Sequence, residues 1–112
     1  MYAYDPVRTM ARAYEALAAG DIDGFVRPLA PAIVTPVLTQ ILGSVPADAT
    51  ALRLTAATFQ FANGRLRVNG YCQAIRRTDG THLRAPFCHE WQLMYGVAWR
   101  FDTHPERTTL DV

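Results

Sequence analysis

Lysine is absent from this chain of 112 residues, and all eleven basic residues are arginine. Ten acidic residues bring the formal charge to +1, and the charged residues are scattered along the sequence. No segment forms the basic stripe that neutralises nucleic-acid phosphates, so we expect no nucleic-acid partner. Exclusive use of arginine, together with frequent alanine, is typical of a GC-rich bacterial genome. The length fits one domain, so we expect a single domain over residues 1–112.

Long apolar runs and cysteines are also scarce. No window approaches the roughly 20 apolar residues that a membrane span needs, and the first residues lack the pattern of a secretion signal. We therefore expect a cytoplasmic protein with no membrane partner. Cys72 and Cys88 are too few for a disulfide framework and lack metal-ligand spacing, so we interpret them as free thiols. Without a phosphate-binding glycine loop or a metal-ligand cluster, the sequence implies no cofactor and no metal.

Helical signals come first along the chain. Asp5 as the N-cap and Pro6 at the first helical position predict a helix over residues 5–19, and a second capped helix follows over residues 21–28. The next stretch, residues 32–43, fits either a short strand or one or two helical turns. Two helices therefore precede the long strands.

Beyond Asp48 the apolar residues alternate, which predicts four strands at about 51–62, 65–78, 81–95 and 97–104. Asn63-Gly64 and Asp79-Gly80 are strong hairpin signals, because both central residues of a tight turn adopt positive φ. The third turn, at Tyr95-Gly96, has a weaker signal. These turns predict an antiparallel meander.

Two-residue turns at all three sites place most apolar strand positions on one face of the sheet. That face contains Ala57, Phe59, Phe61, Leu66, Val68, Gly70, Cys72, Ala74, Ala85, Phe87, His89, Trp91 and Leu93. The last strand adds Ala98, Arg100, Asp102 and His104, which puts polar groups at one end of an apolar surface. The other face is mixed and suits solvent or a partner subunit.

Two stretches of this pattern resemble a known group of proteins. YEALAAGDIDGFVRPLAP at 14–31 and APFCHEWQL at 85–93, followed by Trp99 to Asp102, resemble SnoaL-like and ketosteroid isomerase-like members of the nuclear transport factor 2-like superfamily. The resemblance covers nearly the whole chain and implies an α+β fold, a cone-shaped barrel of N-terminal helices packed on a curved antiparallel sheet. It also implies a pocket between sheet and helices, and frequent homodimerisation. The superfamily contains isomerases, polyketide cyclases, epoxide hydrolases, dehydratases and non-catalytic binding modules, so the fold does not select an activity.

The catalytic residues of ketosteroid isomerases find no match in this chain. The positions of their tyrosine and two aspartates correspond here to Ala13, a site near Val37, and Cys88. Steroid isomerisation by those groups is therefore not expected. SnoaL-like cyclases place acid or base residues on the last strands, where this chain has His89, Asp102, His104 and Glu106.

The pair best suited to catalysis is His89 with Asp102, which the third turn places opposite each other on the apolar face. A carboxylate beside imidazole fixes one tautomer, so the other ring nitrogen can move a proton near neutral pH. Arg100 could stabilise an enolate, and Tyr14 could donate a second hydrogen bond if its helix lies over the sheet. An apolar substrate would contact Phe25, Phe59, Phe61, Phe87 and Trp91. These residues predict a small cofactor-free cyclase, isomerase or dehydratase that acts on an apolar or polyketide-like carbonyl compound.

Other interpretations of the same residues remain open. His89 and Asp102 could be only a structural polar pair, or Arg100 could pair with Asp102 and leave His89 alone. A β-bulge in the third strand would turn Cys88, and not His89, toward the pocket. Tyr14 could be a core residue, and the aromatic side chains could fill the pocket. The chain would then be a non-catalytic module of the same fold that binds a ligand or dimerises.

Overall fold

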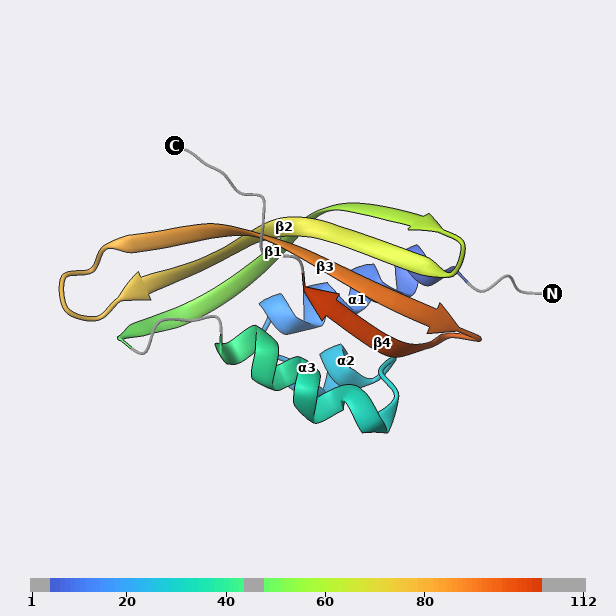
Figure 1. Ribbon diagram of the computed structural model, residues 1–112. Coiled ribbons are helices and arrows are strands. Elements are labelled where there is room, and N and C mark those ends of the chain that lie inside the picture. Colours follow the sequence, from blue (N-terminus) through green and yellow to red (C-terminus); the bar gives the residue numbers. More distant parts are fainter. Residues whose placement is uncertain (1–4, 44–47, 104–112) are drawn as a thin grey trace.

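Three helices precede a four-stranded antiparallel sheet in the computed structural model, which describes residues 5–43 and 48–103. The elements are α1 (Pro6–Ala18), α2 (Ile22–Val26), α3 (Pro31–Gly43), β1 (Ala49–Ala62), β2 (Arg65–Arg76), β3 (His82–Met94) and β4 (Val97–Thr103). The strands lie in the order β1-β2-β3-β4, and the helices lie against one face of the curved sheet (Figure 1). We call this the inner face, and the opposite one the outer face. The predicted fold class is confirmed.

Aspartate side chains begin the first two helices, as the sequence predicts. The backbone N–H of Arg8 donates to Asp5 Oδ1 at 3.1 Å, and the N–H of Gly24 donates to Asp21 Oδ1 at 3.0 Å. Each contact satisfies one of the N–H groups that a helix start leaves without a partner. The stretch that the sequence left open is helical, and α3 contains Pro36. None of the described helices is long and apolar enough to cross a membrane.

Two of the three hairpins have the predicted two-residue turns. Asn63 and Gly64 have φ angles of 54° and 77°, and Tyr95 and Gly96 have φ angles of 51° and 83°. Positive φ at both positions matches the twist of the flanking strands. The weak signal at Tyr95-Gly96 therefore marks a genuine turn.

The loop between β2 and β3 is longer than predicted. The N–H of Arg76 donates to the Thr81 carbonyl at 2.9 Å, so residues 77–80 form the loop in place of Asp79 and Gly80 alone. The partner of each β3 residue shifts by two positions. Because side chains alternate with a period of two, this shift leaves each of them on its predicted face.

A β-bulge in β1 places one residue away from the inner face on which the sequence predicted it. The pairing shifts between Ala56 and Thr58, so Ala57 is exposed, whereas Ala56 and Leu54 lie on the inner face. A single additional residue moves all later side chains of a strand to the opposite face. Phe59 and Phe61 lie between the bulge and the Asn63-Gly64 turn, so they keep their predicted pairing with Val68 and Leu66, and the change of face applies to residues on the N-terminal side of the bulge.

A second bulge, in β4, changes the predicted pairing between β3 and β4. Ala98 pairs with Leu93, but Arg100 pairs with Gln92, so Trp99 is an additional residue. Beyond the bulge Phe101 lies opposite Trp91 on the inner face. Arg100 and Asp102, predicted on the inner face, therefore lie on the outer one.

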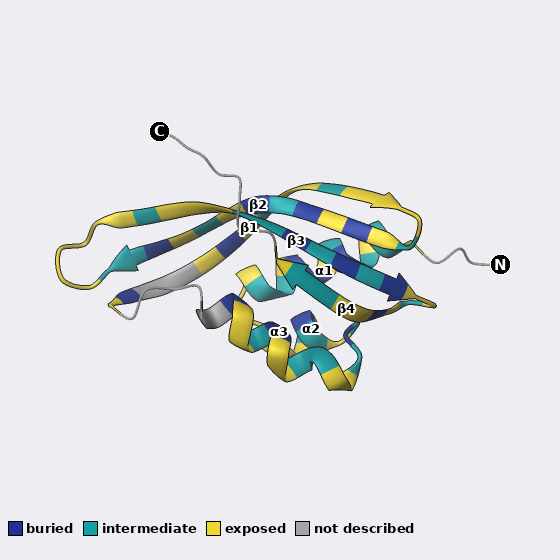
Figure 2. Cartoon of the chain, in the orientation of Figure 1, coloured by how far each residue is buried: buried dark blue, intermediate teal, exposed yellow. Residues whose placement is uncertain are grey.

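The core lies between the inner face and the helices (Figure 2). Its largest fully buried side chains are Trp91, Phe25, Met10, Leu66, Val37 and Val68. The connection between α2 and α3 covers the edge of β4: the Ala98 N–H donates to the Pro28 carbonyl, and the Ala30 N–H donates to the Ala98 carbonyl, both at 2.8 Å. These bonds satisfy part of an edge that would otherwise be open.

Candidate functional site

Tyr14 of α1 and two residues of β3 form a hydrogen-bonded group inside the core. Tyr14 Oη lies 2.6 Å from His89 Nδ1, and Trp91 Nε1 donates to Tyr14 Oη at 3.0 Å. His89 and Trp91 share the inner face because they are two residues apart on a strand. Tyr14, His89 and Trp91 are 2%, 5% and 0% exposed. The three side chains therefore lie in an environment almost free of water.

The hydrogen bonds favour one tautomer of His89. If Tyr14 Oη donates to Nδ1 and accepts from Trp91 Nε1, the hydroxyl hydrogen has an acceptor and the imidazole proton is on Nε2. The reverse arrangement would leave both the hydroxyl hydrogen and the Nε2 lone pair without partners, which is costly in a buried site. Among residues 5–43 and 48–103, Nε2 meets no hydrogen-bond acceptor. Within the part of the chain that the structure describes, His89 thus carries a buried donor with no acceptor.

Burial also sets the charge of this group. Desolvation lowers the pKa of His89 from its ordinary value of 6.5 to about 3, so the imidazole is neutral at neutral pH. Desolvation raises the pKa of Tyr14, against the opposing effect of the Trp91 hydrogen bond, so the hydroxyl keeps its proton. The expectation of a histidine that titrates near neutral pH is wrong, because the sequence did not reveal how dry the site is. His89 is a poor base but a competent neutral hydrogen-bond donor.

Aromatic rings enclose the imidazole. The Phe87 ring stacks on His89 with 4.3 Å between centroids, and Phe101 meets His89 edge-on at 5.0 Å. Gly70 of β2 lies opposite Phe87, and a Cβ there would collide with the Phe87 ring and with the backbone oxygen of Thr55. Gly70 therefore leaves room both for the β1 backbone at Thr55 and for the Phe87 ring.

Asp102 and Arg100 do not join His89. Because of the bulge at Trp99, Asp102 pairs with Glu90 on the outer face, and Thr103 is the cross-strand partner of His89. Arg100 Nε donates to Asp102 Oδ2 at 3.3 Å. The predicted pairing of His89 with Asp102 is wrong, and the alternative in which Arg100 takes Asp102 is the one observed.

The choice between His89 and Cys88 is decided in favour of His89. The β2–β3 pairing is regular, and Cys88 lies opposite Asn69 on the outer face. Tyr14 lies over the sheet as expected, but its hydroxyl meets His89 directly. His104 and Glu106 lie outside the described residues. Within the described part of the chain, no group of three His, Cys, Asp or Glu side chains could hold a metal ion.

The five aromatic residues predicted to contact substrate lie in different environments. Phe25 and Trp91 are fully buried, Phe59 and Phe87 are partly buried against the core, and Phe61 is 42% exposed. A cavity of about 210 Å³ between α1 and β1 is lined by Ala11, Tyr14, Glu15, Ala18, Leu54, Thr55, Ala56 and Phe59. It is smaller than the ~300 Å³ at which small-molecule sites usually begin. Aromatic rings thus fill part of the space in which the resemblance implied a pocket.

Phe101 and Gly70 are the site residues that the sequence analysis missed. A register that buries Arg100 and Asp102 while exposing Phe101 contradicts the hydrophobic pattern, and one bulge removes the contradiction. Gly70 stands alone inside a strand, which is a signal of close approach by another group. Both signals were therefore present in the sequence.

Solved structures share this architecture over most of their length. The chain is similar to an NTF2-like protein of unknown function from Burkholderia pseudomallei, with 22% identity, 91% of each chain covered and a TM-score of 0.69. It is similar to TerC, crystallised with polyporic acid (19% identity, 88% of this chain and 89% of that chain, TM-score 0.69). It is also similar to IdmH from Streptomyces antibioticus, described as a candidate polyketide cyclase (11% identity, 89% and 92% covered, TM-score 0.68).

No protein-family model and no curated protein matches the sequence. At the identities of the similar structures, the likeness defines the fold and leaves the activity open. The chain therefore has a nuclear transport factor 2-like fold, as the resemblance implied.

Proposed function

We propose that this chain binds an apolar, polyketide-like carbonyl compound whose oxygen accepts a hydrogen bond from His89 Nε2–H. One observation carries the proposal: this donor belongs to a side chain that is only 5% exposed, and it meets no acceptor among the described residues. A ligand oxygen would remove the cost of leaving the donor unpaired. The similarity to IdmH, a candidate polyketide cyclase, supports this ligand class at the level of the fold.

On such a compound, the chain would act as a cofactor-free cyclase or isomerase. If the Glu15 carboxylate, which lines the cavity between α1 and β1, takes the proton from the carbon beside the carbonyl group, negative charge develops on the carbonyl oxygen, and a fixed N–H donor stabilises that charge. Tyr14 would hold His89 in the required tautomer, and Trp91 would orient the Tyr14 hydroxyl. The role of His89 is electrophilic, because an imidazole with a pKa of about 3 takes up protons poorly at pH 7.

A cavity through which a ligand could enter lies beside α1, although His89 is not among the residues that line it. Tyr14, which contacts His89, also lines the cavity between α1 and β1, together with Phe59. A two-ring compound needs more room than about 210 Å³ offers comfortably. Phe59 is only partly buried, so a change of its rotamer is the expected opening movement.

Two matched ligands test the role of the carbonyl group. We expect 2-acetylnaphthalene to bind roughly fivefold more tightly than 2-ethylnaphthalene, the size of effect that one neutral hydrogen bond supplies. NMR of histidine-labelled protein should show the His89 Nε2–H signal shift with the ketone only. His89→Phe should abolish the preference, and Tyr14→Phe should reduce it. Equal binding of the two compounds by the parent chain would show that His89 does not recognise a carbonyl oxygen.

The second candidate is a non-catalytic ligand-binding or dimerisation module of the same fold. The full burial of Phe25 and Trp91, and the absence of Asp102 from the inner face, favour it. Exchange of the acetyl protons of 2-acetylnaphthalene in deuterated water separates the two candidates. Exchange that is faster with the parent chain than with His89→Phe supports the enzyme, and ketone-selective binding without exchange supports the module. Homodimerisation and a cytoplasmic location stay predictions.

A further inference from the structure

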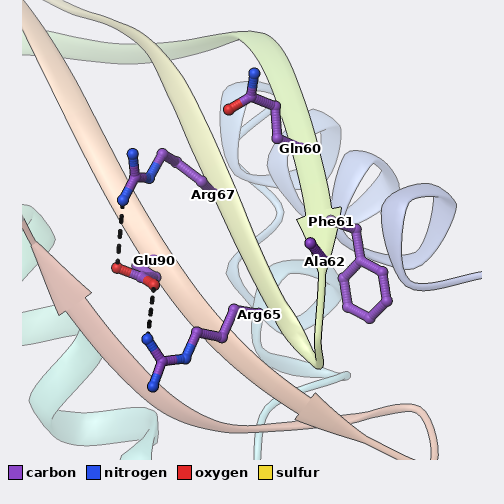
Figure 3. A pocket seen from close by; sticks show the side chains of 6 residues that line it. All are labelled: Gln60, Phe61, Ala62, Arg65, Arg67 and Glu90. Atoms are coloured by element: carbon purple, nitrogen blue, oxygen red, sulfur yellow. Dashed lines mark ion pairs between the residues drawn. The ribbon is translucent and has the colours of Figure 1, made fainter.

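Two hollows on the outer face of the sheet lie on the wrong side to serve His89. Arg65 and Arg67 gather around Glu90, with nitrogen to oxygen distances of 3.9 Å, beside a hollow of about 250 Å³ (Figure 3). An apolar groove of about 480 Å³ is lined by Met94, Tyr95, Val97 and Trp99. The sheet lies between these hollows and the imidazole. The cavity of about 210 Å³ between α1 and β1, in contrast, lies on the same face as His89.

Three side chains separate this inner cavity from the imidazole. The first is Tyr14, which lines the cavity and contacts His89. The second is Val68, which pairs with Phe59 of the cavity wall on one side and with His89 on the other. The third is Phe87, whose ring stacks on His89 with 4.3 Å between centroids. A ligand in the cavity must pass one of these side chains to reach the donor.

The Phe87 ring reaches from β3 across β2 toward the cavity. Ala56 of the cavity wall, Gly70 and Phe87 lie in one row across β1, β2 and β3. A Cβ on Gly70 would lie 2.9 Å from Ala56 Cα and 2.9 Å from Phe87 Cζ, the far end of the ring. Since the same ring stacks on His89, Phe87 fills the space between a wall of the cavity and the imidazole.

Phe87 is also the side chain that can move at the lowest cost. Tyr14 is held by two hydrogen bonds and Val68 is 0% exposed, whereas Phe87 is only partly buried and its ring has no hydrogen-bonding group. The next pair of inner-face positions, Cys72 and Ala85, has small side chains, and Ala85 is exposed. A change of rotamer can therefore turn the ring toward Ala85.

We infer that Phe87 is a gate between the cavity and His89, a role that rests on the proposed binding of a carbonyl oxygen by His89. When the ring moves aside, a carbonyl compound gains a hydrogen bond from Nε2–H, and a hydrocarbon of the same shape gains none. A ligand shifts such an equilibrium only by its differential affinity for the two states. The closed ring thus keeps hydrocarbons in the cavity and admits carbonyl compounds to the donor, so Phe87 is a specificity-determining residue.

Replacing Phe87 by a smaller residue should open the gate permanently. We expect Phe87→Ala to bind 2-ethylnaphthalene, which has no carbonyl group, roughly tenfold more tightly than the parent chain, because an apolar space left by a missing ring takes up aromatic ligands. NMR titration of histidine-labelled protein measures this affinity. The hydrocarbon should shift the His89 ring signals in Phe87→Ala and leave them unmoved in the parent chain. Phe87→Leu, which disturbs the core less, should give the same changes to a smaller extent.

Phe101→Leu is the matched control for Phe87→Leu. Phe101 also contacts the imidazole, edge-on at 5.0 Å, but it lies on β4, on the side of His89 away from β1. Its replacement removes a ring from His89 without opening a path to the cavity. The affinity for 2-ethylnaphthalene should therefore stay close to that of the parent chain. Thermal melting should confirm that each variant folds.

Three outcomes would overturn the gate: hydrocarbon binding that is no tighter in either Phe87 variant, an equal gain in Phe101→Leu, or a shift of the His89 signals by the hydrocarbon in the parent chain. The same titrations with 2-acetylnaphthalene test the proposed function separately. A parent chain that prefers the ketone, with no gain in the Phe87 variants, would keep the proposed function and reject the gate. Equal binding of ketone and hydrocarbon in every protein, with both bound more tightly by Phe87→Ala and both shifting its His89 signals, would support the gate and reject carbonyl recognition.

Discussion

The two tryptophans of this chain lie on opposite faces of the same sheet. Trp91 on β3 is 0% exposed and donates its N–H to Tyr14, whereas Trp99 on β4 is 45% exposed and borders the apolar groove of the outer face. The inner face excludes water, so His89 is neutral and hydrogen-bonded. The outer face stays hydrated, so its arginines remain charged and accessible. One sheet thus separates a dry, hydrogen-bonded group of side chains from a hydrated, charged surface.

Replacing each tryptophan by alanine should give the largest contrast between the faces. Trp91→Ala leaves a core cavity and takes the hydrogen-bond donor from Tyr14, so we expect the free energy of unfolding to fall by about 3–5 kcal/mol. Trp99→Ala should change it by less than about 1 kcal/mol. Urea denaturation measures both. Similar losses in the two variants would show that the outer face is packed against something in the isolated chain.

The stability of the inner face should depend on pH through His89. Its pKa is about 3 in the folded chain and near 6.5 when unfolded, so the unfolded state binds the extra proton between these values. Its stabilising contribution is complete above pH 6.5 and decreases by about 1.4 kcal/mol per pH unit as pH falls toward 3. His89→Gln should lack this contribution.

Comparing the urea denaturation of the parent chain and His89→Gln at several pH values isolates this effect, because the carboxylates titrate in both proteins. The difference between them should shrink steadily as pH falls from 6.5. A difference that is constant down to pH 4 would mean that the imidazole is hydrated and that the site is not dry.

The smallest expected effect is that of Asp102→Asn. Asp102 and Arg100 form a half-exposed pair, so its loss should cost less than about 1 kcal/mol. It should also leave the pKa of His89 unchanged, since the two side chains are on opposite faces. NMR titration of His89 measures this. A clear fall in the His89 pKa would place the carboxylate beside the imidazole and contradict the bulge at Trp99.

The local elements could be predicted because their causes lie within a few residues. Asp5 with Pro6 is sufficient to begin α1, and Asn63-Gly64 is sufficient to close the first hairpin. His89 was placed on the inner face correctly even though the β2–β3 loop was read too short, because a shift of two residues preserves the face. Alternation of apolar residues thus predicts the sheet face on which a side chain lies more reliably than the residue with which it pairs across the strands.

The bulge at Trp99, the contact of Tyr14 with His89, and the gathering of the arginines were decided only by the tertiary structure. A bulge is one additional residue whose position depends on which side chain packs best across the strands, and here Phe101 fills the inner position. The neutral charge of His89 follows from desolvation by residues that are distant in sequence. The sequence by itself determined helices, strands and most facing positions, since these follow from local geometry. Distances, partners and protonation depend on how the faces meet in space, so only the folded chain decides them.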